Sequence, residues 1–301
     1  MTPRVVIDAT EYAHHPMELS TKPGMAWMLG EIAQTVKGLG YETHVVLQGA
    51  VEMYENGISY WPQERHPEVC DVFISPSAKS ALDIRTVKTL AGDALTESWP
   101  AIAMPSVAKV PGKMVWMAGA GRGLWHLLEM WDSIKQQVPH ASVVVGHNPK
   151  SYVDIFSWQH DFQGLFAMRL QEFLARDDVT ALNNAKRSDV LRHVAEAELF
   201  AYPADPISPR DGHRSLSAYE AARAGCALLF APSEKLGEDY DGVAGFIENP
   251  WHHGQWVETI AHWLTAPAEL QSWQQKASRW ASKHTRMSFQ KGWRTRLAQA
   301  A

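Results

Sequence analysis

A carboxylate and a helix start lie between two short apolar runs in the last third of the chain, within Ala197–Pro232. Leu199–Tyr202 predicts a strand, a proline-rich loop follows, and a helix carrying Glu220 leads to a second strand over Ala227–Ala231. A carboxylate can accept hydrogen bonds from two vicinal hydroxyls. The free N–H groups at a helix start favour phosphate. This combination favours a ligand that carries both groups, as a sugar nucleotide does.

The start of the predicted helix holds Arg214, Ser215 and Leu216, whose amides are candidates for binding the phosphates or the sugar. Small residues surround Glu220 on the helix: Ala218, Ala221, Ala222 and Ala224. A helix with such a small surface packs closely, so we expect its carboxylate to have a function. Gly225 then ends the helix before the next strand.

A second candidate lies at Gly119–Gly123, where the sequence GAGRG joins a predicted strand to a predicted helix. Gly119, Gly121 and Gly123 would let the backbone approach a phosphate, and Arg122 adds a guanidinium suited to a diphosphate. The dinucleotide-binding pattern is not met, because no acidic residue closes a following strand at the required distance. Lys186–Arg187 forms a second basic spot after the predicted strand Val179–Leu182, at the carboxyl end of that strand, where a doubly wound sheet binds its ligand.

Strands and helices alternate along the chain, which indicates parallel sheets with helices on their faces. In the first part, strands are predicted at Val5–Ile7, Thr43–Leu47 and Asp71–Ser75, with helical patterns over Met25–Leu39 and much of Ser80–Leu95. Two prolines and a glycine interrupt the pattern at Met104–Lys113, after which the alternation begins again. The fold class expected is therefore α/β, with two Rossmann-like parallel-sheet domains facing a ligand cleft.

The pattern predicts three segments: a first domain over residues 1–110, a second domain over 111–282, and a C-terminal helix over 283–301. The chain has 301 residues, 46% of them hydrophobic, which is ample for packed cores. Its net charge of −5 gives no bulk attraction to nucleic acid or anionic membranes.

Targeting and membrane signals are not apparent. The N-terminus enters a strand directly, without a charged and then apolar leader, and no apolar run approaches the length of a membrane span. We therefore expect a cytoplasmic protein with no integral membrane association. The two cysteines, Cys70 and Cys226, lie beside apolar runs and are expected to be buried rather than to form a disulfide or a metal site.

Three stretches resemble retaining GT-B glycosyltransferases of family 4, and together they run from about Met114 to Ile247. SLSAYEAARAGCALLFA is similar to that family's signature, in which a Glu, two small residues and a Gly precede a strand. MVWMAGAGRGLWHLLEMWDSIKQQVPHASVVVGHNP resembles the opening of its donor domain, and VTALNNAKRSDVLRHVAEAELFAYP resembles the next strand, helix and strand.

The resemblance implies a retaining glycosyltransferase that moves a hexose-like sugar from a nucleoside-diphosphate sugar to an acceptor hydroxyl. It also implies that residues 1–110 form the acceptor-side domain, that 111–282 form the donor domain, and that the C-terminal helix over 283–301 returns to the first domain. Carried over by position, Arg122 contacts the diphosphate, Glu220 the ribose hydroxyls, and the amides of Arg214 to Leu216 the phosphates or the sugar, with Lys186 as a further contact. Enzymes of this family need neither a metal nor a cofactor, because fixed positive groups and a helix end stabilise the departing diphosphate.

The chain departs from the family pattern in three ways. Gly212 stands where the family has a second Glu, although the adjacent Asp211 could replace it if the loop shifts by one residue. The family's first basic residue before Arg122 is missing, and the N-terminal half is short. No catalytic residue is therefore assigned. His14, with its neighbour His15, and Asp211 remain candidates, and the acceptor is open between a glycan, a small molecule and a modified DNA base.

Other functions remain open. A phage-type glycosyltransferase acting on a hydroxymethylated DNA base would need a local basic patch, for which the candidates are Lys109, Lys113, Lys283, Arg286, Lys291, Arg294 and Arg296. A degenerate, non-catalytic nucleotide-binding protein would explain the missing Glu. A nucleotide-sugar epimerase shares the architecture, but its paired carboxylates and catalytic histidines are not found.

Overall fold

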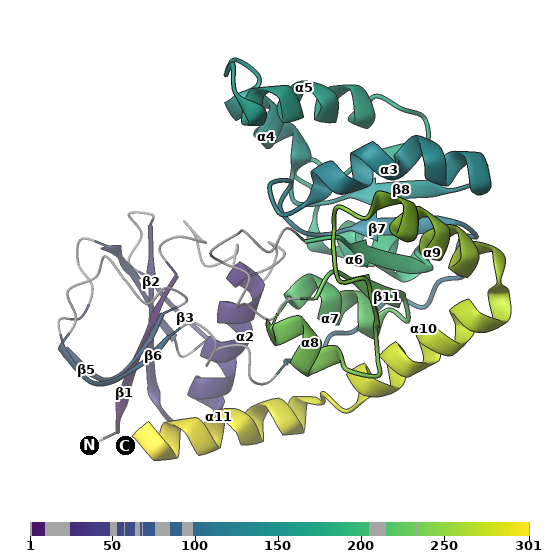
Figure 1. Ribbon diagram of the computed structural model, residues 1–301. Coiled ribbons are helices and arrows are strands. Elements are labelled where there is room, and N and C mark those ends of the chain that lie inside the picture. Colours follow the sequence, from purple (N-terminus) through teal and green to yellow (C-terminus); the bar gives the residue numbers. More distant parts are fainter. Residues whose placement is uncertain are drawn as a thin grey trace. The chain divides into compact units, whose positions relative to one another are not determined.

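The computed structural model describes residues 2–9, 25–48, 53–56, 58–63, 67, 69–75, 85–91, 99–204, 215–232 and 234–300. The chain divides into two compact units, drawn in Figure 1. The first comprises Met1–Ala101 together with Lys283–Ala301, and the second comprises Ile102–Ser282. The C-terminal segment thus belongs to the same unit as the N-terminus.

The first unit is built on a six-stranded sheet with the order β3-β4-β2-β1-β5-β6. Its pairs are parallel except for β3 with β4. The strands are β1 (Arg4–Asp8), β2 (Glu42–Leu47), β3 (Met53–Glu55), β4 (Ile58–Pro62), β5 (Val69–Ser75) and β6 (Arg85–Ala91). Helix α2 (Met25–Gly38) packs its apolar face, including Met28, Ile32 and Val36, into the core.

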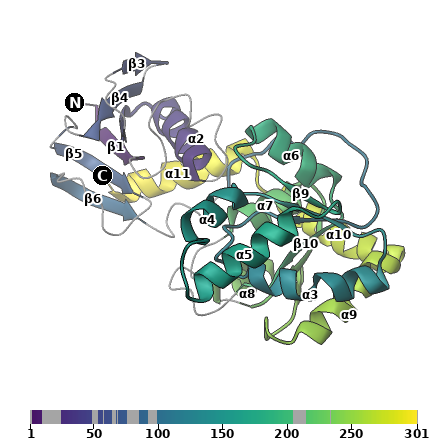
Figure 2. The same cartoon turned by 90° about the horizontal axis from the view of Figure 1, so that it is seen from above.

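Helix α11 (Arg286–Ala300) lies beside α2 in both views of the fold (Figures 1 and 2). Phe289, Trp293 and Leu297 are buried at a spacing of four residues, which places them on one helix face. Such a stripe must cover apolar surface of the first unit, so the C-terminal helix completes that unit's core.

One element of the first unit was predicted wrongly. The stretch Ser80–Leu95 was expected to be largely helical, but Arg85–Ala91 forms the edge strand β6, paired in parallel with β5. The sequence RTVKTLA is rich in β-branched residues, which favour strands, and Val72 and Phe73 of β5 lie opposite Lys88 and Thr89. Pairing with β5 therefore overrides the weak helical pattern.

The second unit has a six-stranded, fully parallel sheet with the order β12-β11-β10-β7-β8-β9. The strands are β7 (Lys113–Trp116), β8 (Ser142–Val145), β9 (Val179–Ala181), β10 (Leu199–Tyr202), β11 (Ala227–Phe230) and β12 (Gly245–Phe246). Strands β7, β10 and β11 are buried along their whole length. This matches a parallel sheet that helices cover on both faces.

Helices lie on both faces of this sheet (Figure 1). They are α3 (Leu124–Gln137), α4 (Pro149–Phe156), α5 (Phe162–Leu174), α6 (Arg187–Glu196), α7 (Leu216–Arg223), α8 (Glu234–Tyr240), α9 (His253–Thr265) and α10 (Pro267–Ser282). Helix α3 contacts α5 and α9, whereas α7 contacts α6 and α10. Four of the buried residues of α3 recur at the spacing of one helix face: Leu124, Leu127, Trp131 and Ile134.

The expected α/β class with two parallel-sheet domains is confirmed. Both cysteines are buried, as expected. Across the described ranges, no helix is both long enough and apolar enough to cross a membrane.

Candidate functional site

The strand order of the second unit indicates where a ligand is expected to bind. From β7 the chain proceeds outward to β8 and β9, then returns to β10 on the other side of β7. At such a reversal the loops that leave the two strands diverge, and ligands bind at the carboxyl ends of the strands. The candidate residues are therefore those that follow β7, β8, β9 and β10.

The turn after β7 contains the predicted phosphate-binding glycines. The Arg122 amide donates to the Gly119 carbonyl at 3.0 Å, which closes the turn. Gly123 has a φ of +100°, and a Cβ there would lie 2.2 Å from the Pro203 carbonyl oxygen, in the chain that follows β10. Gly123 is therefore required by backbone geometry, whereas a Cβ at Gly119 would meet no atom within 4 Å.

The first turn of α7 is tied to the end of β7. Ser215 is the N-cap, and its side chain accepts a hydrogen bond from the Ala218 amide at 3.2 Å. The Ser217 hydroxyl donates to the Met117 carbonyl, which directly follows β7. The start of α7, with Leu216 as its first residue, therefore lies at the carboxyl edge of β7, where its unpaired amides are suited to an anion.

Glu220 is buried in this region, with 4% of its surface exposed. Its Oε1 lies 2.8 Å from Nη1 of Arg187, the first residue of α6. Burial raises the pKa of Glu220, and the charge and hydrogen bond of Arg187 oppose that rise. Lys186, the predicted contact, is exposed at the N-cap of α6. The structure thus brings Arg187, rather than Lys186, to the predicted carboxylate.

His147 is a site residue that sequence reasoning missed. It follows β8 with a φ of +59°, and its ring is hydrogen-bonded to the Met117 backbone. Desolvation of the ring, followed by the charge of Arg122, lowers the pKa of His147. The side chain is exposed, so the ring is a candidate hydrogen-bonding group for a ligand beside the β7 turn. The sequence feature that could have identified His147 is its position directly after a predicted strand, in VVVGH.

Several predicted site residues lie outside the described part of the chain. These are His14, with its neighbour His15, and Asp211 and Arg214. The catalytic candidates His14 and Asp211 therefore stay predictions, and so does the replacement of the missing Glu by Asp211. Among the residues that the structure describes, no group of three or more His, Cys, Asp or Glu side chains could hold a metal ion.

Two lysines of the basic patch predicted for DNA binding form contacts within the second unit instead. Lys113 is 8% exposed and pairs with Glu196, with Nζ and Oε2 2.5 Å apart. The Lys109 ammonium donates to the carbonyls of Ala197 and Ala224 at 2.5 and 2.8 Å. Because these contacts occupy both ammonium groups inside the second unit, neither is available to nucleic acid.

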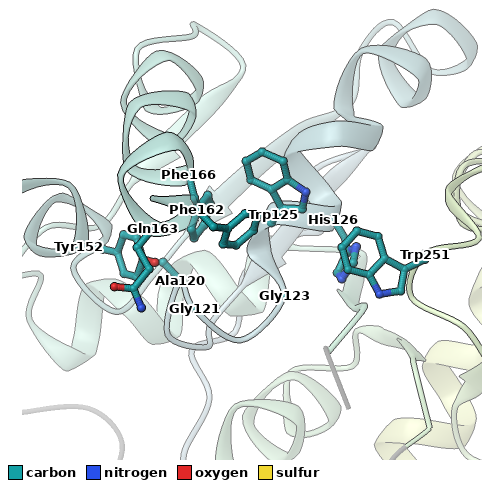
Figure 3. Close-up of a pocket in the computed structure, with 10 residues that line it drawn as sticks. All are labelled: Ala120, Gly121, Gly123, Trp125, His126, Tyr152, Phe162, Gln163, Phe166 and Trp251. Carbon is teal, nitrogen blue, oxygen red and sulfur yellow. The ribbon is translucent and has the colours of Figure 1, made fainter. Parts of the chain in front are cut away.

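A pocket of about 340 Å³ lies beside the glycine turn (Figure 3). It is lined by Ala120, Gly121, Gly123, Trp125, His126, Tyr152, Phe162, Gln163, Phe166 and Trp251. Of the predicted donor-site residues, it includes only Gly121 and Gly123. Among the described residues, its wall is mainly aromatic and includes no Asp, Glu, Lys or Arg side chain.

The aromatic rings of this pocket are held by their neighbours. Trp125 packs at 5.1 Å from Phe162 and 5.7 Å from Phe166, between ring centroids. His126 meets Trp251 edge-on at 4.5 Å, and its Nδ1 lies 3.1 Å from Nε2 of His253. The glycine turn therefore lies between a polar edge formed by β7, α7 and His147 and this aromatic wall.

Comparisons with known proteins establish the class of fold. No family model matches the sequence, and no curated protein matches it closely enough to count as a relative. Solved structures do match, and at the identities given below the similarity establishes the fold. It is the GT-B fold of glycosyltransferases, with two parallel-sheet units.

Three of these structures are glycosyltransferases or sugar-phosphate synthases. WaaG, a glycosyltransferase involved in lipopolysaccharide biosynthesis, matches with a TM-score of 0.58 and 13% identity over 92% of this chain and 95% of its own. Sucrose-phosphate synthase from Thermosynechococcus elongatus matches with a TM-score of 0.64 and 8% identity over 99% and 98%. The pneumococcal O-GlcNAc transferase GtfA, solved with UDP and GlcNAc, matches with a TM-score of 0.50 and 12% identity over 89% of this chain and 59% of its own.

Proposed function

We propose that this protein is a retaining glycosyltransferase that transfers a sugar from a nucleoside diphosphate to an acceptor hydroxyl without a metal ion. One observation carries the proposal. At the topological reversal of a GT-B donor unit, the start of α7, the Arg122 turn and the buried Glu220 gather around the carboxyl ends of β7 and β10. An anion-binding helix start and a buried carboxylate suit the phosphate and ribose parts of one ligand.

The donor would bind with its diphosphate at the amides of Ser215 and Leu216 and at Arg122. Glu220 would accept hydrogen bonds from the ribose hydroxyls. In the reaction, the bond between sugar C1 and the phosphate oxygen breaks, and its electron pair goes to the diphosphate. The new bond from C1 to the acceptor oxygen forms on the same face, and the acceptor proton passes to the departing diphosphate. Arg122 and the helix start stabilise the negative charge that develops on the diphosphate.

Nucleotide binding is the first test. Isothermal titration with UDP, GDP, ADP, CDP and dTDP should give saturable binding of at least one diphosphate, equally in EDTA and in magnesium. Glu220→Gln should weaken that binding by about ten- to a hundredfold, because a hydrogen bond to a charged group contributes about 1.5–3 kcal/mol. Glu238→Gln, on the same unit in α8, is the matched control and should bind as the wild type does.

Transfer is the second test. With the matching nucleotide sugar and an acceptor panel of glycans, small alcohols and hydroxymethylated DNA, NMR of the product should show the donor's anomeric configuration. Inverted product would contradict retention. Tight nucleotide binding with neither transfer nor donor hydrolysis would instead favour the non-catalytic alternative. The absence of binding to all five diphosphates would refute the proposal.

A further inference from the structure

A buried ion pair joins two helices at the edge of the donor unit. Arg187 begins α6, which follows β9, and Glu220 lies within α7, which follows β10. Arg187 Nη1 and Glu220 Oε1 are 2.8 Å apart, and the side chains are only 9% and 5% exposed. Both helices start at the carboxyl edge of the sheet, so the pair lies where a parallel sheet binds its ligand.

A buried ion pair of this kind contributes little net stability to the folded state. Taking two charges out of water costs about as much as their attraction returns, and apolar residues of similar size often serve as well. Around Glu220 the helix otherwise buries Ala218, Ala221 and Ala222, which offer no polar group, and Tyr219, which carries a hydroxyl. The charge and the hydrogen bond that act on the Glu220 carboxylate come from Arg187. Arg187 is thus the side chain that decides which way the carboxylate points.

We propose that Arg187 is a positioning residue, which holds the Glu220 carboxylate in the orientation that binds the ribose hydroxyls of the donor. The Arg187 guanidinium binds Oε1 of Glu220 and fixes the rotation of the carboxylate. The remaining lone pairs of the carboxylate can then accept hydrogen bonds from the ligand. This inference rests on the proposed function, since it needs Glu220 to be a donor contact. Arg187 itself touches no reacting atom.

The ion pair also sets the protonation of Glu220. Burial raises the pKa of Glu220, and the charge and hydrogen bond of Arg187 lower it. On α7 itself, Tyr219 and Arg223 are the neighbouring ionisable groups, and burial raises the pKa of Tyr219. No ionisable side chain of α10 or β11, which are fully described and also pack against α7, contributes to the pKa of Glu220. Without Arg187, the carboxylate would stay protonated to a higher pH and lose its role as an acceptor.

The test measures binding of the tightest of the five diphosphates to the full-length chain by titration calorimetry from pH 5.5 to 8.5. Arg187→Gln should weaken binding at neutral pH by about tenfold, and the loss of binding on acidification should begin at a higher pH than in the wild type. Arg187→Lys keeps the charge but not the planar fork, so its binding should be weaker with the wild-type pH profile. Arg192→Gln is the matched control, because Arg192 lies on the same helix with 56% of its side chain exposed.

The two proposals fail in different ways. If Glu220→Gln binds as tightly as the wild type, Glu220 is not the ribose contact and the proposed donor site is wrong. If Glu220→Gln weakens binding while Arg187→Gln and Arg187→Lys match Arg192→Gln in affinity and pH profile, only the positioning role is refuted. Circular dichroism checks folding, and should Arg187→Gln fail to fold, the affinity of Arg187→Lys decides. The double variant Arg187→Gln/Glu220→Gln should bind no more weakly than Glu220→Gln alone.

Discussion

The glycines of the β7 turn differ in how strictly the backbone geometry requires them. Gly123 has a left-handed backbone and leaves no room for a Cβ, whereas Gly119 and Gly121 are not constrained in that way. A strand-to-helix turn with three glycines is ambiguous in sequence, because each glycine can serve either the backbone or a ligand. The structure separates them, and this separation gives two matched substitutions within one turn.

Gly123→Ala should destabilise the second unit by about 2 kcal/mol or more, because the added Cβ would lie 2.2 Å from a backbone oxygen in a strained conformation. Gly121→Ala should change the unfolding free energy by less than about 0.5 kcal/mol, since its Cβ would sit 3.6 Å from the Tyr152 ring. Urea denaturation followed by circular dichroism measures both. Equal midpoints for the two variants would contradict the assignment.

Gly119→Ala separates folding from binding in the same turn. Its Cβ would enter open space, so the fold should persist with an unchanged urea midpoint. If the turn receives the diphosphate, that Cβ takes up room that the phosphate needs, and diphosphate affinity should fall about tenfold or more. Wild-type affinity in Gly119→Ala would place the phosphates elsewhere.

Sequence patterns predicted the site's helix and turns but not its pairings. The spacing around Glu220 located α7, and GAGRG located the β7 turn, because local chemistry specifies helix caps and tight turns. The sequence analysis identified Lys186–Arg187 as a basic spot for a ligand and did not predict that either residue pairs with Glu220. Which of the two faces the carboxylate depends on how α6 packs on α7, and such packing involves residues 33 positions apart in the chain.

At the scale of elements, the periodic segments were the most predictable. Leu199–Tyr202 was predicted as a strand with the bounds that β10 has, because a fully buried parallel strand reads as a continuous apolar run. Helix α4 and strands β3 and β4 were not predicted, because short elements contain too few repeats of the hydrophobic pattern to be recognised in the sequence. Strand β6 was mistaken for a helix because its neighbour β5, rather than its own pattern, determines its conformation.

Lys109 connects two elements of the second unit. Its ammonium binds the carbonyls of Ala197 and Ala224, which are the C-cap residues of α6 and α7. A cation there gives both carbonyls a charged donor, in addition to the Cys226 thiol that donates to the Ala197 carbonyl at 3.2 Å, and it complements both helix dipoles. The same two helices carry Arg187 and Glu220 at the proposed donor site.

Lys109→Met should therefore lower the free energy of unfolding by about 1–3 kcal/mol, because two partly buried carbonyls lose a charged donor. Urea denaturation provides the measurement. Lys150→Met is the control, since the Lys150 ammonium makes only an exposed pair with Asp154, and this variant should change stability by less than about 0.5 kcal/mol. A Lys109→Met midpoint equal to that of Lys150→Met would show that the two carbonyls need no cation.

At the scale of the whole molecule, each unit contains a histidine whose environment lowers its pKa. In the first unit, His44 Nδ1 accepts from Trp61 Nε1 at 2.9 Å, and Nε2 lies 2.9 Å from Glu42 Oε1. Burial is the main cause that lowers the pKa of His44, and the Glu42 carboxylate only partly opposes it. In the second unit, burial and the Lys113 charge lower the pKa of His193.

Both units should consequently lose stability on mild acidification. A histidine with a lowered folded-state pKa is protonated first in the unfolded chain, so the unfolded state binds more protons as the pH falls below about 6.5. Below about 4.5 the carboxylates of Glu42 and Glu196 add to the loss, because their ion-pair and hydrogen-bond partners lower their pKa in the folded state. Glu220 acts in the opposite direction, because its raised pKa lets the folded state take up a proton first.

Thermal unfolding at pH 7.5 and pH 5.5 tests this sign directly. The wild-type melting temperature should fall by several degrees between these conditions, and His44→Gln should show a smaller fall because one group that drives the linkage is gone. His160→Gln, at an exposed position in the second unit, should fall as much as the wild type does. A melting temperature that rises on acidification would mean that the proton uptake of buried carboxylates such as Glu220 outweighs that of the histidines. An equal fall in His44→Gln and the wild type would instead remove His44 from the linkage and leave His193 as the group to replace next.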